Sequence, residues 1–263
     1  VLDQRGRTVN FKGATDYLWI WGQWVDHDIG LTHPAEPHEP FFIMVPRGDS
    51  WFDPAFTGRM VIPLNRSIYN ATSKPRQQVN VQSSFIDASN VYGASEARAS
   101  ALRLNNGTGK LKTGPEGYLP YNIDRLKNDP SDDPHFYLAG DPRANEQPTL
   151  TAMHSLFVLE HNRIAHELYH QDSNQTGETI YQRARQKVIA INQVITYKEW
   201  LPVLLGSEMR PYSGYKSDVN PGIRNIFSTA CFRLGHSIVS SELLRLNADL
   251  SSISEGPLKL RDG

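Results

Sequence analysis

The sequence predicts a mostly α-helical protein with long ordered loops and little sheet. Two segments, 149–171 and 178–206, repeat apolar side chains at the spacing of a helix face. No stretch alternates apolar and polar residues for long enough to build a sheet, and no internal repeat is present. Between the helices lie segments rich in Pro, Gly, Asn and Asp. Ordered loops of this length usually carry function or wrap a ligand.

A first helix is expected over residues 15–28, and it carries the triplet DHD close behind three tryptophans. Gln23 and His27 are four residues apart and share one face, Asp26 borders that face, and Asp28 points about 100° away. For an average triplet of this kind, a solvated helix end is the simpler interpretation. The aromatic flanks favour a buried site, in which His27 acts as an acid or base and Asp28 binds a hard cation.

A second segment, SSFIDAS, supports the cation. It alternates oxygen donors, with side-chain oxygens on Ser83, Asp87 and Ser89 and the carbonyl of Phe85 between them. Ca²⁺ takes roughly six to eight oxygen ligands in a flexible geometry. Taken alone, the segment is better interpreted as a Ser/Asp turn closed by local hydrogen bonds. One acid is too little charge for tight binding, and Asp28 would supply a second carboxylate.

A short helix is expected over 93–104, and the loop that follows it, 105–148, ends in GDPRANEQP. Arg143 and Glu146 are three residues apart in this segment, and a surface ion pair is the default interpretation. A fixed arginine beside His27 could instead polarise an oxygen–oxygen bond while the neutral imidazole moves a proton.

The two long helices have recognisable ends. Pro148 blocks backward extension of the first, and Thr149 can cap its start. Pro202 is expected to kink or end the second, and Gly206 is a natural stop. Four histidines recur along the first helix without sharing one face, and no role is assigned to them: His154, His161, His166 and His170.

The last helical segment, expected over 223–239, contains CFRLGHSIVSS, with His236 directly after Gly235 and three residues after Arg233. A lone histidine on an apolar helix is more often a hydrogen-bonded core residue than a ligand. Gly235, however, would let a flat group approach the backbone closely. A neutral imidazole in such a place is a good axial ligand for haem iron.

Six segments resemble the animal-type haem peroxidases of the peroxidasin–cyclooxygenase superfamily, in the family's order and at similar intervals. They are GQWVDHD, SSFIDASNVYG, DPRANEQP, MHSLFVLEHNRIAHEL, ITYKEWLPVLLG and FRLGH. Any one would be unconvincing, but six in order across nearly the whole chain are highly specific. The resemblance implies helices around a central haem, with residues 1–263 forming a single partial haem peroxidase domain. The C-terminal part of the family domain would then lie beyond Gly263.

The resemblance also implies roles for individual residues. Three match the distal catalytic set, with the histidine as acid/base: His27, Arg143 and Gln23. Two match carboxylates that form ester bonds to the methyl groups of haem b: Asp26 and Glu146. Two match the proximal side, as the iron ligand and an arginine near a haem propionate: His236 and Arg233. Five match the family's calcium site: Asp28, Ser83, Phe85, Asp87 and Ser89.

The implied activity is oxidation of halide, thiocyanate or small phenolic donors by hydrogen peroxide, through an iron–oxo intermediate. His27 would take a proton from the peroxide and return it to the departing oxygen, while Arg143 stabilises the developing charge. One alternative is a fatty-acid oxygenase of the same superfamily, although such enzymes typically lack the acid pair around the distal histidine. Another is a non-enzymatic adhesion module that kept the fold, against which the full distal set argues.

Two departures from the family stand out. Gln147 stands where the myeloperoxidase-like members have a methionine bonded to haem, so at most two covalent links are expected. Cys231 is the single cysteine, so no internal disulfide can form, which favours a bacterial or invertebrate-like relative.

The composition and the ends of the sequence limit the possible partners and the cellular location. The 27 Lys and Arg residues nearly balance the 28 Asp and Glu residues, so no global field points to nucleic acid or an anionic membrane. No apolar run is long enough to cross a bilayer. The chain opens VLDQRGRTVN, without an initiator methionine or a leader, which indicates a cropped or processed piece. Four sequons suit a secreted, extracellular protein: Asn65, Asn70, Asn106 and Asn174.

Overall fold

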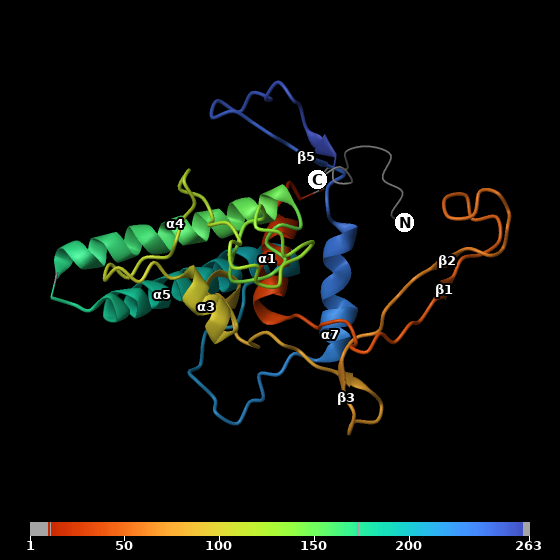
Figure 1. Cartoon of the computed structure of the whole chain (residues 1–263), viewed down its shortest axis with the longest axis horizontal. Coiled ribbons are helices and arrows are strands. Elements are labelled where there is room, and N and C mark those ends of the chain that lie inside the picture. Colours follow the sequence, from red (N-terminus) through yellow and green to blue (C-terminus); the bar gives the residue numbers. More distant parts are fainter. Residues whose placement is uncertain (1–9, 11, 173, 260–263) are drawn as a thin grey trace. The chain divides into compact units, whose positions relative to one another are not determined.

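The computed structural model describes residues 10, 12–172 and 174–259, and helices are the main regular structure among them (Figure 1). The opening segment without an initiator methionine lies almost wholly outside the described residues. The described residues of 1–29 and 82–263 form one compact unit, and residues 30–81 form another. Every residue that the sequence analysis places in the haem and calcium sites belongs to the larger unit.

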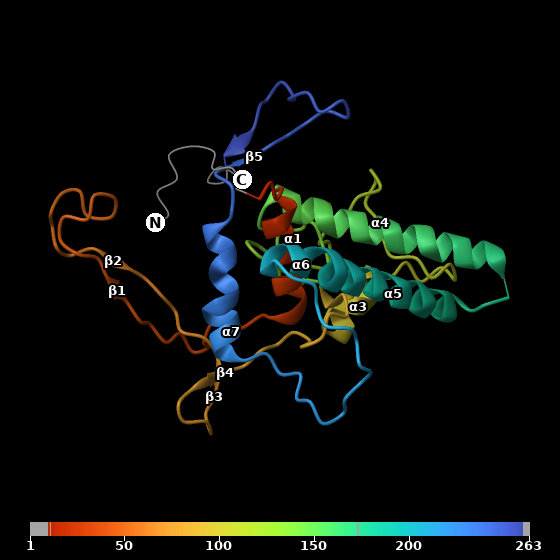
Figure 2. The same cartoon turned by 180° about the vertical axis from the view of Figure 1, so that it is seen from behind.

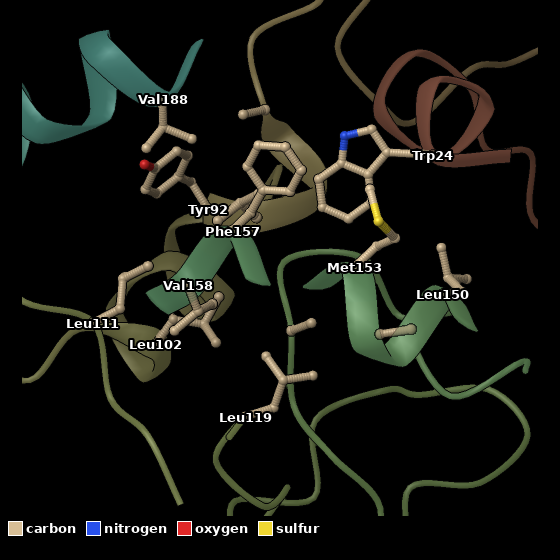
Figure 3. Close-up of a cluster of buried hydrophobic side chains, with 14 of the residues drawn as sticks. Trp24, Tyr92, Leu102, Leu111, Leu119, Leu150, Met153, Phe157, Val158 and Val188 are labelled. Atoms are coloured by element: carbon tan, nitrogen blue, oxygen red, sulfur yellow. The ribbon is translucent and has the colours of Figure 1, made fainter. Parts of the chain in front are cut away.

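α1 (Tyr17–Ile29) corresponds to the first predicted helix and is buried along most of its length. Its tryptophans anchor it to the core. The Trp24 ring stacks on the Phe157 ring with 4.8 Å between centroids (Figure 3). The Trp24 indole also donates a 2.6 Å hydrogen bond to Oδ1 of Asn192. A buried tryptophan is stable where its N–H finds such a partner. The aromatic stretch therefore holds α1 in place, and the DHD triplet at its end is buried with it.

Two long helices, α4 (Pro148–Gln171) and α5 (Gly177–Val194), lie side by side and antiparallel in the larger unit (Figures 1 and 2). The start of α4 differs from the expectation, because Gln147 and not Thr149 caps it. Oε1 of Gln147 accepts a 2.8 Å hydrogen bond from the backbone N–H of Thr149. Pro148 forms the first helical position, where a missing N–H costs nothing.

α5 continues directly into a π-helical turn, η1 (Ile195–Trp200), and then into α6 (Leu201–Leu205). Pro202 does not end the helix, because it lies in the first turn of α6. The helix ends at Gly206, as predicted, and the φ of 73° at that glycine is left-handed. The π-helical turn brings the indole of Trp200 to α1, where it donates a 2.8 Å hydrogen bond to a backbone carbonyl.

Shorter elements complete the fold. α3 (Glu96–Leu102) lies within the helix predicted over 93–104, and α2 (Ser89–Tyr92) is an additional short helix just before it. α7 (Asn225–Thr229) and a 3-10 helix, η2 (Cys231–Ser237), stand where one was predicted over 223–239. None of the helices in the described part of the chain has the length and apolar character needed to span a membrane.

The sheet content is small, as predicted. Each strand found among the described residues is two residues long and pairs with one antiparallel neighbour. The pairs are β1 (Ile43–Met44) with β2 (Val61–Ile62), β3 (Tyr69–Asn70) with β4 (Gln77–Gln78), and β5 (Glu242–Leu243) with β6 (Leu258–Lys259). The first two pairs belong to the smaller unit, and the third to the larger one.

His161 of α4 is a structural residue in the core. Its Nε2 lies 2.9 Å from the carbonyl oxygen of Gly109, and its Nδ1 lies 2.9 Å from the hydroxyl of Tyr92. Because a carbonyl can only accept, Nε2 carries the proton and the Tyr92 hydroxyl donates to Nδ1. Burial lowers the pKa of His161 from 6.5 to about 4.

We therefore expect the free energy of unfolding to fall as the pH drops from 6.5 towards 4. In that window the unfolded chain binds a proton at residue 161 that the folded chain does not, which costs about 2 kcal/mol by pH 5. Urea unfolding at pH 7 and pH 5 measures this loss. A His161→Gln variant should be less stable at pH 7 but should lose correspondingly less between the two pH values. An unchanged pH dependence in that variant would refute the assignment.

Candidate active site

A cavity of about 350 Å³ lies between α1 and η2 in the larger unit. α1 contributes Gln23, Asp26 and His27 to its lining, and η2 contributes Arg233 and His236. Much of the remaining lining is apolar and includes Trp19, Trp200, Leu204, Phe232, Ile238 and Val239. The segments that hold the predicted distal and proximal histidines, far apart in the sequence, therefore meet around one space.

His27 is almost completely buried, and its ring is directed towards two carboxylates. Its Nε2 lies 3.5 Å from Oε2 of Glu146, and its Nδ1 lies 3.7 Å from Oδ1 of Asp141. Nδ1 has no hydrogen-bond partner among the described residues. Burial, reinforced by the positive charge of Arg143, lowers the pKa of His27 to about 3. The imidazole is therefore neutral at pH 7, which is the state that can accept a proton.

A chain of side-chain hydrogen bonds lies beside His27. Nε2 of Gln23 donates to Oε2 of Glu146 at 3.1 Å, and Nε2 of Gln147 donates to Oε1 of Gln23 at 3.0 Å. Burial raises the pKa of Glu146. The structure thus brings together the predicted residues Gln23, His27 and Glu146. It adds Gln147, which the sequence analysis considered only as a departure from the family.

An ion pair joins α1 to η2 at the edge of the cavity. Nη1 of Arg233 donates to Oδ2 of Asp26 at 3.0 Å. Burial raises the pKa of Asp26, and the charges of Arg233 and Arg143 oppose that shift. Asp26 and His27, adjacent in sequence, both line the cavity but contact different partners, as their directions on a helix require.

Arg143 lies next to His27 and contacts its backbone. The guanidinium donates from Nη2 to the backbone carbonyl of His27 at 3.4 Å, and Arg143 lines a neighbouring cavity, which it shares with Glu146 and Gln147. Asp141 holds the guanidinium by accepting hydrogen bonds from Nε of Arg143 at 2.9 Å and from Nη2 at 2.7 Å. The expected proximity of Arg143 to His27 is therefore present.

Asp141 is a functional candidate that the sequence analysis missed. It is completely buried, and Nε2 of Gln82 donates to its Oδ2 at 2.8 Å. Burial alone would raise the pKa of Asp141, but hydrogen bonds and charge from Arg143 hold it at about 2. Gly140 makes this position possible, because a Cβ there would lie 2.5 Å from the backbone carbon of Val91 in α2. The signal available in the sequence was an acid two residues before the arginine in GDPR.

The predicted calcium ligands lie together only in part. Asp28 is 1% exposed, and its Oδ1 accepts a 2.8 Å hydrogen bond from the Ser89 hydroxyl. Asp87 lies close enough for its charge to add to the effect of burial, and together they raise the pKa of Asp28 to about 6. Oγ of Ser83 accepts a 3.2 Å hydrogen bond from the backbone N–H of Phe85, as in the turn considered as the alternative.

No group of three or more His, Cys, Asp or Glu side chains that could hold a metal ion occurs among the described residues. A cation near Asp28 would therefore depend on hydroxyl and carbonyl oxygens beside the two carboxylates. Asp28 forms no ion pair within the described part of the chain, although it is almost completely buried. A buried carboxylate without a counter-charge is the feature that a bound cation would stabilise.

Comparison with known proteins identifies the family. The family model for the animal haem peroxidases matches residues 1–263. This chain belongs to the animal haem peroxidase family. It is 46% identical, over 93% of its length, to the human protein named probable oxidoreductase PXDNL. It is 36% identical over 91% of its length to the peroxidasin homologue pxn-1 of Caenorhabditis elegans, and 35% identical over 94% to mouse thyroid peroxidase.

Solved structures confirm the predicted fold class. Peroxidase A from Dictyostelium discoideum superimposes with a TM-score of 0.91 at 28% identity, covering 100% of this chain and 54% of that one. A fatty acid α-dioxygenase of Arabidopsis thaliana, at a TM-score of 0.76 and 20% identity, shares the fold over 99% of this chain. The chain spans 22% of the pxn-1 protein, 19% of PXDNL and 32% of mouse thyroid peroxidase.

Proposed function

We propose that this chain forms part of a haem-dependent peroxidase that uses hydrogen peroxide to oxidise halide, thiocyanate or small phenolic donors. The observation that carries the proposal is that His27 and His236, from α1 and η2, line one cavity. Family membership supports a peroxidase, and the 28% identity to a peroxidase exceeds the 20% identity to an α-dioxygenase. The acidic residues beside His27, Asp26 and Asp28, also favour a peroxidase over a fatty-acid oxygenase.

The residues of this cavity fit a haem. Its apolar walls suit a porphyrin, and the exposed imidazole of His236 is the group that would bind the iron. Asp26 and Glu146 would form the two ester bonds, and Arg233 would pair with a propionate. Haem supplies the redox chemistry when bound. Arg233, which contacts Asp26 in this structure, is thus the cation that would hold the propionate.

The side chains of this protein would supply the proton transfer and the charge stabilisation. Nε2 of His27, neutral because of burial, would take a proton from hydrogen peroxide and return it to the departing oxygen. The hydrogen bond from Gln23 would orient the Glu146 carboxyl beside that nitrogen. Arg143, held by Asp141, would place a fixed positive charge next to the site of oxygen–oxygen cleavage.

The test is an absorption spectrum of the full chain with haem, recorded before and after peroxide, together with a donor-oxidation assay. We expect a Soret band that shifts on peroxide addition, and haem that stays attached through extraction with acidified acetone. His236→Ala should lose the native spectrum, whereas the exposed control His135→Ala should keep it. A chain without peroxide turnover that instead consumes oxygen with a polyunsaturated fatty acid would establish the oxygenase alternative.

We also propose that Asp28, Asp87, Ser83, Ser89 and the Phe85 carbonyl bind Ca²⁺. The support is the buried carboxylate of Asp28, whose pKa burial raises to about 6, beside a second acid. Calcium there would fix the residue next to His27 and so steady the distal side of the cavity.

Removal of Ca²⁺ by a chelator is expected to lower the thermal midpoint of the chain, because a ligand that binds only the folded state stabilises it. Readdition of Ca²⁺, but not of Mg²⁺, should restore the midpoint, since Mg²⁺ demands a tighter octahedral site. Asp28→Asn should abolish the response, and Asp124→Asn, at an exposed carboxylate, should retain it. A midpoint that is indifferent to Ca²⁺ in the unaltered chain would contradict the assignment.

A further inference from the structure

The four histidines of α4 lie on two faces of the helix. His154 and His161 are seven residues apart, almost two full turns, and both are buried in the core. His166 and His170 are four residues apart, and both are exposed. The five residues from His161 to His166 turn the helix by about 140°, which places the second pair on the solvent face. Neither member of the exposed pair lines the cavity between α1 and η2.

The two exposed imidazoles lie against each other. Their ring centroids are 4.3 Å apart, and the ring planes are inclined at 75°. When two imidazoles bind one metal ion, each ligating nitrogen lies about 2.0–2.1 Å from it, which puts the ring centroids about 4.5 to 5 Å apart. The rings of His166 and His170 therefore need only a small rotation to hold an ion between them.

Both rings are available as ligands. Neither ring forms a hydrogen bond or an ion pair within the part of the chain that the structure describes. His170 stands in the last turn of α4, where carbonyl groups without helical partners favour a positive charge. The nearby acid Glu167 is engaged, because its Oε1 accepts a 2.6 Å hydrogen bond from Nη1 of Arg163. The pair therefore offers a cation two protein ligands, both of them imidazoles.

We propose that His166 and His170 bind a divalent late transition-metal ion, Cu²⁺ in preference to Zn²⁺, with water completing its coordination. Imidazole nitrogen suits these ions, whereas Ca²⁺ and Mg²⁺ prefer oxygen ligands. Of the first-row divalent ions, Cu²⁺ forms the most stable complexes with a given set of such ligands. Two protein ligands make an open site, in keeping with the absence of any larger metal-binding group of His, Cys, Asp or Glu among the described residues.

This site differs from the others proposed for the chain in its ligands and in its effect. Calcium near Asp28 would depend on oxygen ligands, and haem iron would take its protein ligand from His236. The α4 site requires only that residues 166–170 remain helical, since the helix brings the two imidazoles together. An ion bound there would stabilise the C-terminal end of α4, and its binding is independent of haem and of peroxidase activity.

The experiment is equilibrium dialysis of the full chain against Cu²⁺, with and without haem and in the absence of peroxide. We expect one tightly bound ion per chain in both conditions, and two nitrogen ligands in the electron paramagnetic resonance spectrum of the bound Cu²⁺. An excess of Ca²⁺ should not displace that ion. A tight site that disappears when haem is added would identify His236 as the ligand and overturn the proposal.

Four variants identify the ligands. Each of His166→Gln and His170→Gln should lower the affinity for Cu²⁺ by about 100-fold, because the second imidazole of a chelating pair acts at high effective concentration. The double variant His170→Gln, Gln171→His keeps the number of histidines but moves one imidazole about 100° round the helix, and it should lose the same affinity. His135→Gln, at a side chain that is 93% exposed, should keep it. Unchanged affinity in either single α4 variant or in the double variant would show that the ion is held elsewhere.

Discussion

Replacing His27 by alanine is expected to lower kcat/KM for hydrogen peroxide by about 10³-fold, the size of a lost general acid–base catalyst. The reason is the state of the imidazole, since burial lowers its pKa to about 3 and leaves Nε2 able to accept a proton across the neutral range. No other neutral base lines the cavity on the α1 side, within the described residues. Steady-state donor oxidation at varied peroxide concentration measures the effect.

Two controls separate this loss from damage to the fold. His135→Ala removes an imidazole whose side chain is 93% exposed and should leave the activity unchanged. The absorption spectrum of His27→Ala with haem should resemble that of the unaltered chain, because His236 and not His27 is the expected iron ligand. Peroxide turnover of His27→Ala within a few-fold of the unaltered chain would show that the proton passes through another group.

The two long helices could be predicted because apolar residues recur along them at the spacing of one helix face. Apolar repeats defined α4 and α5, and Gly206 ended the second helix as its left-handed geometry requires. The cap of α4 was not predictable from residue type, because Gln147 reaches the backbone of Thr149 only in the conformation that the loop adopts. Nor does periodicity reveal the π-helical turn that carries Trp200 to α1.

The positions of site residues could be predicted from the sequence when the residues lie on the same helix. They could not be predicted when a contact between distant segments orients the side chain. Gln23, Asp26 and His27 follow from helical spacing, and all three line the cavity. The partnership of His27 with His236 rested on resemblance to the family, because no local pattern links α1 to η2. Asp141 was missed because nothing in the local sequence shows its burial, which follows from the close approach of Gly140 to α2.

Removing the charge of Asp141 should weaken both the fold and the proposed reaction. Asp141→Asn removes the carboxylate that holds Arg143, whose side chain is 16% exposed, and breaking such a buried pair costs about 3 kcal/mol of unfolding free energy. Loss of the contact with Asp141 should also lower kcat by about 100-fold, with a smaller change in KM, because the guanidinium then no longer places a fixed charge at the transition state. Urea unfolding and peroxide kinetics measure the two effects.

The double variant Asp141→Asn, Arg143→Gln decides whether Asp141 acts through Arg143. If its task is to hold that guanidinium, removing both charges should recover part of the stability that Asp141→Asn loses, because no unpaired buried charge remains. The activity of the double variant should equal that of Arg143→Gln alone. Asp141 only positions Arg143, so Asp141→Asn has no further effect on activity once the Arg143 guanidinium has been removed. Additive losses in both measurements would mean that the Asp141 carboxylate supports the site through Gln82 and not through Arg143.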